Sequence, residues 1–179
     1  MSVAINWRKR QSYIARSEMG KTMDKAWLKA LGHMCYGIYV LTTADREKIN
    51  GMIASWVSQV SYDPPLVSVA VHPKRYSHDM IQGSGHFALH LLKRDQRYLL
   101  QKFKLPNPAS KFESLAWSRG ETGCPILKEC LAFMECKVRK IYNPGNHTLF
   151  IGQVVAAQLV SEEPPLTTLD YEGVYLGRE

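Results

Sequence analysis

The stretch NGMIASWVSQVSYDPP, residues 50–65, contains the most unusual predicted strand of the chain. Its opening Asn-Gly favours a hairpin turn, and its closing Asp63-Pro64-Pro65 stops a strand because proline cannot donate to a sheet ladder. A half-buried strand normally alternates apolar and polar side chains. Here small and hydroxyl-bearing residues fall on both faces. The pattern predicts that either a ligand or a tightly packed helix approaches the backbone closely.

The segments on either side of this stretch predict a mainly β protein. Runs rich in β-branched, aromatic or alternating residues predict further strands at 35–43, 66–72, 86–92, 132–142 and 148–160, with a possible last strand in the tail after residue 163. Helical spacing or a helix-start signal appears at 21–34, 77–83 and 93–103. Strands outnumber helices and are joined by short turns. This organisation favours a closed antiparallel barrel with short helical insertions over a parallel α/β sheet.

The length of 179 residues suits one domain with a substantial core. Residues 1–20 are basic and mixed in character, so we expect an N-terminal arm outside a single domain at 21–179. No apolar run approaches the roughly 18–20 residues of a membrane span, and the N-terminus lacks the apolar centre of a secretory signal. We therefore expect a cytoplasmic protein without a membrane partner.

The net charge of +7 allows three interpretations: a basic surface, a nucleic-acid partner or a small phosphorylated ligand. Basic residues cluster at Arg8–Arg10, at Lys74–Arg75 and at Lys102–Lys111. The four cysteines, Cys35, Cys124, Cys130 and Cys136, have no CxxC spacing, so a zinc site is not expected. They are interpreted as reduced core residues.

The segment HPKRYSHDMI, residues 72–81, carries an anion-binding pattern. It follows a predicted buried strand and leads into a helix for which Ser77 is a suitable N-cap. A helix N-terminus exposes unpaired N–H groups, and Lys74 and Arg75 stand beside this one. The alternative is a solvated basic turn with an ordinary cap. If the turn binds a phosphate, the strand at 66–72 can bring it close to the small-residue strand.

Two further positions are candidates for a binding site. His147 stands in the turn NPGNH just before a strand, where it is either solvated or at the rim of a pocket. Lys111-Phe112 lies in a long loop, where an exposed pair could close over a ring or a phosphate. The chain has no GxGxxG, GxxxxGK[ST], HExxH or GxSxG motif, which argues against a Rossmann dinucleotide site, a P-loop, a zincin and an α/β-hydrolase.

Together these pieces resemble the flavin reductase-like family of FMN-binding split barrels, which includes flavin reductase components of two-component monooxygenases and flavoredoxin-type electron carriers. The matching segments run in the family's order from about Lys25 to Val160, and include YGIYVLTT, NGMIASWVSQVSYDPPLVSVAV, KRYSHDMI, TGCPIL, ECLAFMECKV and HTLFIGQVV. The resemblance implies a six-stranded antiparallel Greek-key split barrel. It also implies a homodimer that holds FMN at the subunit interface.

The resemblance places the flavin ring on the small-residue strand. It implies that the isoalloxazine lies along the backbone of Ala54, Ser55, Trp56 and Val57. Hydrogen bonds to the ring or ribityl chain are implied for Ser58 and Ser61. The small residues would then admit a flat tricyclic ring, and FMN would supply the redox chemistry.

The resemblance also assigns the basic turn and the two isolated candidates. Lys74, Arg75 and Ser77 would hold the FMN phosphate, and Lys111 and Phe112 match a loop that approaches the cofactor. His147 stands in Gly-Asn-His where the family often has Gly-Asp-His, so it is a possible catalytic residue without the neighbouring carboxylate.

Three functions follow from these interpretations. The first is an NAD(P)H-dependent flavin reductase that passes electrons from NADH or NADPH to FMN, and on to a redox partner, a monooxygenase component or ferric iron. The second is an electron carrier with tightly bound FMN. The third is a basic β-barrel that binds nucleic acid, against which the small-residue strand argues because it supplies no base stacking. No motif distinguishes NADH from NADPH.

Overall fold

The computed structural model describes residues 24–170, and the chain divides into two compact units, Met1–Met34 and Cys35–Glu179. In the first unit, helix α2 spans Lys25–Gly32. Asp24 is its N-cap, and the Oδ1 atom of Asp24 accepts a hydrogen bond from the Ala26 N–H at 2.7 Å. The helix predicted at 21–34 is thus confirmed over a shorter range. The predicted arm, residues 1–20, lies outside the described residues.

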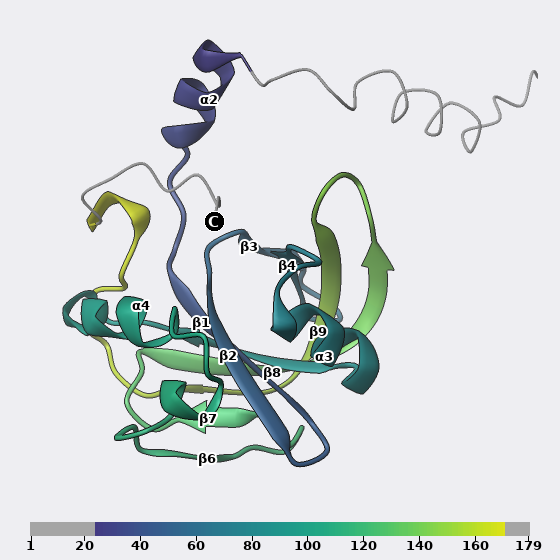
Figure 1. The fold of residues 1–179 in the computed structure, drawn as a ribbon, viewed down its shortest axis with the longest axis vertical. Coiled ribbons are helices and arrows are strands. Elements are labelled where there is room, and N and C mark those ends of the chain that lie inside the picture. Colours follow the sequence, from purple (N-terminus) through teal and green to yellow (C-terminus); the bar gives the residue numbers. More distant parts are fainter. Residues whose placement is uncertain (1–23, 171–179) are drawn as a thin grey trace, which may run out of the picture. The chain divides into compact units, whose positions relative to one another are not determined.

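The second unit is built on a seven-stranded sheet in the order β2-β1-β5-β8-β9-β4-β3 (Figure 1). All its neighbouring strands are antiparallel. The strands are β1 (Tyr39–Asp45), β2 (Lys48–Ala54), β3 (Val57–Ser61), β4 (Leu66–Val71), β5 (His86–Leu91), β8 (Ala132–Tyr142) and β9 (Thr148–Leu159). A separate pair joins β6 (Trp117–Arg119) to β7 (Pro125–Leu127). The mainly β class is confirmed, but the counts of seven and two differ from the expected six.

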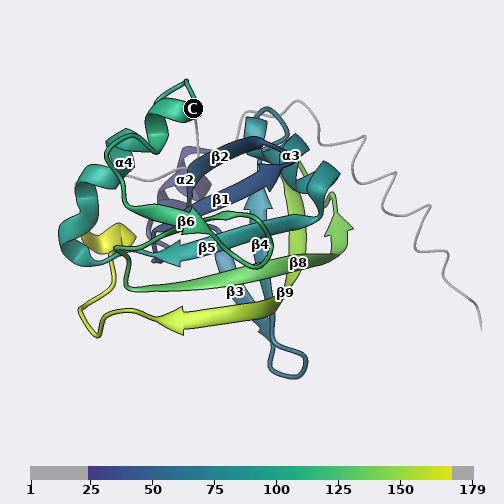
Figure 2. The same ribbon diagram turned by 90° about the horizontal axis from the view of Figure 1, so that it is seen from below.

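The extra strand arises from a break inside the predicted strand at 50–61. β2 and β3, the two edge strands of the large sheet, are consecutive in the chain and separated only by Ser55 and Trp56. The three residue steps from Ala54 to Val57 reach at most about 11 Å, so the sheet must curve until its edges approach each other. Figure 2 shows the result, with β3 and β4 running steeply across the direction of β5 and β8.

The Asn-Gly pair lies inside β2 and not at the hairpin turn that the sequence predicted. The β1–β2 turn is at Arg46, which has a positive φ of 54°, because Asp45 already pairs with Lys48. Gly51 is required for packing, since a Cβ there would lie 2.5 Å from the Phe103 ring. The prediction of a turn at Asn50-Gly51 was therefore wrong, because this glycine allows the Phe103 ring to pack closely against a strand.

Helix α3 spans Tyr76–Ser84 and ends at Gly85, whose φ of 73° is the left-handed conformation of a C-cap. Its N-cap residue is Arg75, with no side-chain cap, so the prediction of Ser77 as the cap was wrong. The remaining helical segments are η1 (Arg94–Arg97), α4 (Tyr98–Lys102), η2 (Ala109–Lys111) and η3 (Thr168–Asp170). None of the helices between residues 24 and 170 has the length and apolar character needed to cross a membrane.

Two large apolar clusters fill the second unit. One includes Leu41, Phe87 and Phe150 between the strands of the curved sheet. The other packs α4 and the long loop against the sheet through Leu99, Phe103 and Phe112 among others. Three of the cysteines are buried as free thiols: Cys124, Cys130 and Cys136. Cys35 is exposed, which corrects its assignment to the core.

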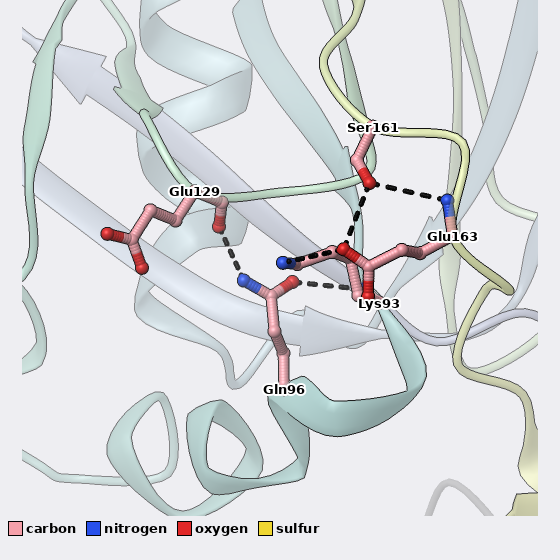
Figure 3. A network of polar contacts seen from close by, with 5 residues as sticks. All are labelled: Lys93, Gln96, Glu129, Ser161 and Glu163. Carbon is pink, nitrogen blue, oxygen red and sulfur yellow. Dashed lines mark hydrogen bonds and ion pairs between the residues drawn. The ribbon is translucent and has the colours of Figure 1, made fainter.

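A polar network fastens the segment after β9 to the start of η1 (Figure 3). Gln96 is 3% exposed; its Oε1 accepts from the Lys93 N–H at 3.0 Å, and its Nε2 donates to the Glu129 carbonyl at 2.7 Å. The Lys93 ammonium forms an ion pair with Glu163 at 3.3 Å, and Ser161 bonds to the same carboxylate. These contacts hold residues 161–163, which follow β9, beside Lys93 at the start of η1.

The buried histidine of β5 makes acid stability testable. The His90 Nδ1 faces the Val40 carbonyl at 3.1 Å and its Nε2 accepts from the Leu127 N–H at 3.1 Å, so the ring is neutral. Burial lowers the pKa of His90 from 6.5 to about 4. Between pH 6.5 and about 4, His90 is therefore protonated in the unfolded chain but remains neutral in the folded chain.

We expect the free energy of unfolding to fall as the pH drops from 6.5 to about 4, with a contribution from His90 of about 3 kcal/mol. In His90→Gln, whose amide can both donate and accept but does not titrate in this range, that contribution should be absent. Denaturant unfolding of both proteins across this range measures the difference. Identical pH dependence in the two proteins would contradict the assignment.

Candidate functional site

A cleft opens where β2 breaks before β3. Its walls come from β2, β4, the turn after β4 and the β8–β9 turn, and are formed by Met52, Ile53, Ala54, Ser55, Trp56, Ala70, His72, Arg75 and His147. Ala54 and Ser55 are buried at 4% and 3% exposure, so one wall is small side chains and backbone. The volume is only ≈ 40 Å³. A ligand larger than a few atoms would therefore lie along the surface of the chain and not within it.

Three aromatic rings border this cleft. His147 packs against Trp56 with ring centroids 4.7 Å apart and meets His72 edge-on at 5.0 Å. The Nδ1 atom of His147 is 2.8 Å from Oδ1 of Asn146. Partial burial, with the nearby His72 and Arg75, lowers the pKa of His147 below its usual value. The ring is consequently a neutral imidazole near pH 7, able to donate or accept a hydrogen bond.

The basic turn is ordered by hydrogen bonds from its own first residue. The His72 carbonyl accepts from the Arg75 N–H at 2.9 Å, and the His72 Nδ1 accepts from the Lys74 N–H at 3.1 Å. Lys74 and Arg75 are both exposed, but only Arg75 lines the cleft. Arg75 also immediately precedes α3, where the first N–H groups of the helix favour an anion.

A buried lysine stands behind this turn. The Nζ atom of Lys111 donates to Oδ1 of Asn50 at 3.0 Å and to the Gly51 carbonyl at 2.9 Å. Burial, followed by repulsion from Arg75, lowers the pKa of Lys111. Among residues 24–170, no carboxylate lies within ion-pair distance of its ammonium. Arg75 and Lys111 thus place two positive charges close enough to repel each other.

Asn50, which was not among the predicted site residues, connects the lysine to the helix. Its Nδ2 donates to the Ser77 Oγ at 2.9 Å while its Oδ1 accepts from Lys111. Ser77 is fully buried, so its hydroxyl supports Asn50 from beneath the turn. A single asparagine in the middle of a buried strand is the signal that was available, because a buried amide requires partners.

Not all predicted site residues converge on the cleft. Val57 and Ser58 line a different, mostly apolar cavity of ≈ 320 Å³, with Tyr39 and Met134, and Ser61 lines neither. The expected exposed pair at 111–112 is buried, with Lys111 8% and Phe112 5% exposed. Phe112 packs edge-on against Phe103, which explains its burial.

A larger cavity of ≈ 640 Å³ lies between the β6–β7 pair and strands β8 and β9. None of the residues singled out from the sequence lines it. Its buried acid, Glu135, already accepts hydrogen bonds from two backbone N–H groups and the hydroxyl at residues 121–122. The cleft at the β2 break is therefore the stronger candidate, because residues singled out from the sequence, Ala54 to Trp56 with Arg75 and His147, line it.

The comparisons with known proteins agree with the fold. A family model described as the flavin reductase like domain matches residues 31–177. The chain belongs to this family.

Three similar proteins illustrate the relationship. The FMN reductase (NADH) SmoA of Agrobacterium fabrum is 30% identical, covering 89% of this chain and 88% of its own. The reductase subunit HsaB of a flavin-dependent monooxygenase from Mycobacterium tuberculosis is also 30% identical, covering 87% of this chain and 82% of its own. The structure of the NADH:FAD oxidoreductase SgcE6 of Streptomyces globisporus superimposes with a TM-score of 0.75 at 27% identity. The match covers 84% of this chain and 92% of that chain.

Some relatives are much longer than this chain. The match to the high molecular weight rubredoxin of Moorella thermoacetica covers 67% of that protein, and the match to diflavin flavoprotein A 1 of Synechocystis covers only 26%. The remaining residues of these relatives lie outside the region that matches this chain.

The contact between His147 and Trp56 provides a test of the cleft. A protonated imidazole beside an indole quenches its fluorescence, and the pKa of His147 is lowered from 6.5. We expect tryptophan emission to fall on acidification with a midpoint below 6.5. The chain has four tryptophans, so the signal from Trp56 is isolated as the difference between wild type and His147→Gln. Overlapping titration curves would show that the two rings are not in contact.

Proposed function

We propose that this protein is an NAD(P)H-dependent flavin reductase that binds FMN in the cleft at the β2 break. The observation that carries the proposal is that Arg75, which lies close enough to Lys111 to repel it, lines the same cleft as the small side chains of Ala54 and Ser55. A flavin mononucleotide has this combination of a dianionic phosphate and a flat ring. The names of two relatives, an FMN reductase (NADH) and an NADH:FAD oxidoreductase, support the same class of reaction.

The geometry changes which of the predicted residues we assign to the phosphate. Arg75 is exposed at the start of α3 and can offer a forked guanidinium. Lys74 adds charge from the same turn. Lys111 lies behind the turn as a second cation that repels Arg75, so a phosphate near both would relieve that repulsion. Ser77 is buried, so we assign it to supporting Asn50 and not to direct contact.

The ring would lie against Ala54, Ser55 and Trp56, where small side chains expose backbone. Because one chain offers a cleft of only ≈ 40 Å³, a second surface must cover the ring. We propose that a second copy of the chain supplies this cover, so that the active form is a homodimer. Counting β2 and β3 as one bent strand gives the six strands of a split barrel, with each site at its open edge.

The protein's own groups orient the reactants and exclude water. Bound FMN would accept a hydride equivalent from NADH or NADPH and pass electrons to an acceptor, so no side-chain nucleophile is needed. His147, neutral near pH 7, can donate a hydrogen bond at the rim without adding a charge there. Trp56 holds that ring in place. We propose a monooxygenase component as the acceptor class, because a relative is named as the reductase subunit of such an enzyme.

A second candidate is an electron carrier that keeps FMN tightly bound. The matches to a rubredoxin and to diflavin flavoproteins favour it. The two functions differ in the fate of the flavin. A reductase loses its flavin on dialysis and oxidises NADH or NADPH only when FMN is added, whereas a carrier purifies yellow and retains its flavin.

The phosphate contact is tested with two flavins. Charge-assisted hydrogen bonds are worth roughly 1.5–3 kcal/mol each, so Arg75→Ala should weaken FMN binding by about tenfold to a hundredfold. Riboflavin, which has no phosphate, should bind weakly and equally to both proteins. Arg97→Ala, which removes an exposed arginine of η1, is the control and should bind FMN as the wild type does. Fluorescence titration measures the affinity of the wild type and of both variants for FMN and for riboflavin.

The reaction itself is tested by anaerobic mixing with NADH and with NADPH in the presence of FMN or FAD. Bleaching of the flavin absorbance with either nucleotide supports a reductase, and a preference for FMN over FAD supports the assigned phosphate turn. If neither nucleotide reduces either flavin, the proposed reaction is wrong. Equal weakening of FMN and riboflavin by Arg75→Ala would instead show that the cleft is misplaced.

A further inference from the structure

Among residues 24–170, the side chain of Lys111 is held only by neutral oxygen atoms. Lys111 ends the η2 segment and is 8% exposed. Its Nζ atom donates to the Asn50 Oδ1 at 3.0 Å and to the Gly51 carbonyl at 2.9 Å. An ammonium group has three hydrogens, and the described residues offer no acceptor for the third. One donor of this buried cation is therefore available to an acceptor outside the described residues.

The residue that faces this cation is an amide and not an acid. Burying an unpaired ammonium is unfavourable, and a carboxylate is its usual partner in a protein interior. Asn50 has the size and shape of aspartate without its charge. Burial, followed by repulsion from Arg75, lowers the pKa of Lys111 accordingly. The fold thus keeps an unfavourable arrangement that a closely similar side chain would remove, and such exceptions are typical of functional sites.

The orientation of the Asn50 amide follows from its two partners. An ammonium group can only donate, so the amide oxygen must face Lys111. The Nδ2 atom then faces Ser77 and donates to the Ser77 Oγ at 2.9 Å. Asn50 is 2% exposed in β2, and Ser77 is fully buried in α3. One amide therefore joins the lysine to the helix that begins directly after Arg75.

We propose that Asn50 is a positioning residue that determines specificity for the flavin phosphate, because it fixes the Lys111 side chain without neutralising its charge. An aspartate in its place would pair with the lysine, and the positive charge would act less strongly on an anion at the basic turn. This inference rests on the proposed function, in which that anion is the phosphate of FMN. Asn50 itself does not line the cleft. Its influence should therefore depend on the charge of the ligand and not on the shape of the ring.

An Asn50→Asp variant tests this role. The new carboxylate has the size of the amide, and the Ser77 hydroxyl can donate to it where it now accepts, so the variant should fold. We expect FMN binding to weaken by about fivefold to fiftyfold, because one nearby positive charge is neutralised. Riboflavin, which has no phosphate, should bind as it does to the wild type. Fluorescence titration of the full-length protein measures both affinities.

Two further variants separate the charge of Lys111 from other effects. Lys111→Gln retains a donor toward Asn50 but carries no charge, so it should weaken FMN binding to a similar extent and leave riboflavin binding unchanged. Asn107→Asp adds the same negative charge at an exposed position of the same loop. Its carboxylate can still accept the hydrogen bond from the Ala109 N–H. This variant is the matched control and should bind FMN as the wild type does.

The charge of Lys111 is also measured without flavin. Carbon NMR of the lysine side chains follows the titration of each ammonium group, and Lys111→Gln assigns the signal of this residue. In the wild type we expect Lys111 to titrate below the ordinary pKa of lysine. In Asn50→Asp the opposite charge favours the ammonium, so the pKa of Lys111 should rise. An unchanged titration would overturn the proposal, because the new carboxylate would then not face the lysine.

The outcomes distinguish this inference from the proposed function. Wild-type FMN affinity in folded Asn50→Asp would refute the role, and so would an equal loss of FMN and riboflavin binding, which a purely structural asparagine would produce. If Asn50→Asp does not fold, wild-type FMN affinity in Lys111→Gln refutes the role in its place. A wild type that binds no FMN refutes the proposed function instead, and the lysine titration still shows whether Asn50 leaves the charge of Lys111 unpaired.

Discussion

The two-residue link between β2 and β3 is the constraint on which the rest of the structure depends. Ser55 and Trp56 connect the first strand of the large sheet to the last, so the sheet can form only if it curves. The turn is closed by a hydrogen bond from the Val57 N–H to the Ser55 carbonyl at 2.9 Å, and β4 holds it through a bond from the Ala70 N–H to the Trp56 carbonyl at 3.0 Å. The apolar cluster of Leu41, Phe87 and Phe150 fills the space that the curvature encloses.

The same link determines where the cleft lies. At the break, backbone and small side chains replace the continuous ladder of a strand, and Trp56 turns toward His147. The next strand, β4, delivers His72 and the basic turn to the opposite wall. Three segments far apart in the sequence, near residues 55, 75 and 147, therefore meet at one point. The fold places the charge of Arg75 next to the least bulky part of the sheet.

Much of this arrangement could be predicted from local patterns. Alternation from Ala132 located β8 at its observed start, and Arg75 of the basic turn before α3 lines the same cleft as Ala54 and Ser55. The errors concern residues whose tertiary contacts override their local preference. Asn50-Gly51 resembles a turn but occupies a strand, because Phe103 fills the space beside the glycine. Lys111 and Phe112 lie in a loop for which the sequence predicts exposure. Both are buried, because Lys111 donates a hydrogen bond to Asn50 and Phe112 packs against Phe103.

The buried ammonium of Lys111 lowers the stability of the ligand-free protein but raises its affinity for an anion. Within residues 24–170 this charge is met only by an amide oxygen and a carbonyl, and burial disfavours it. A neutral side chain there would relax the ligand-free fold but would remove the attraction that an anion finds behind the basic turn. An anion bound beside it would stabilise the folded chain by mass action. Resistance to proteolysis would then follow the supply of ligand, so that scarcity of the ligand would shorten the lifetime of the protein.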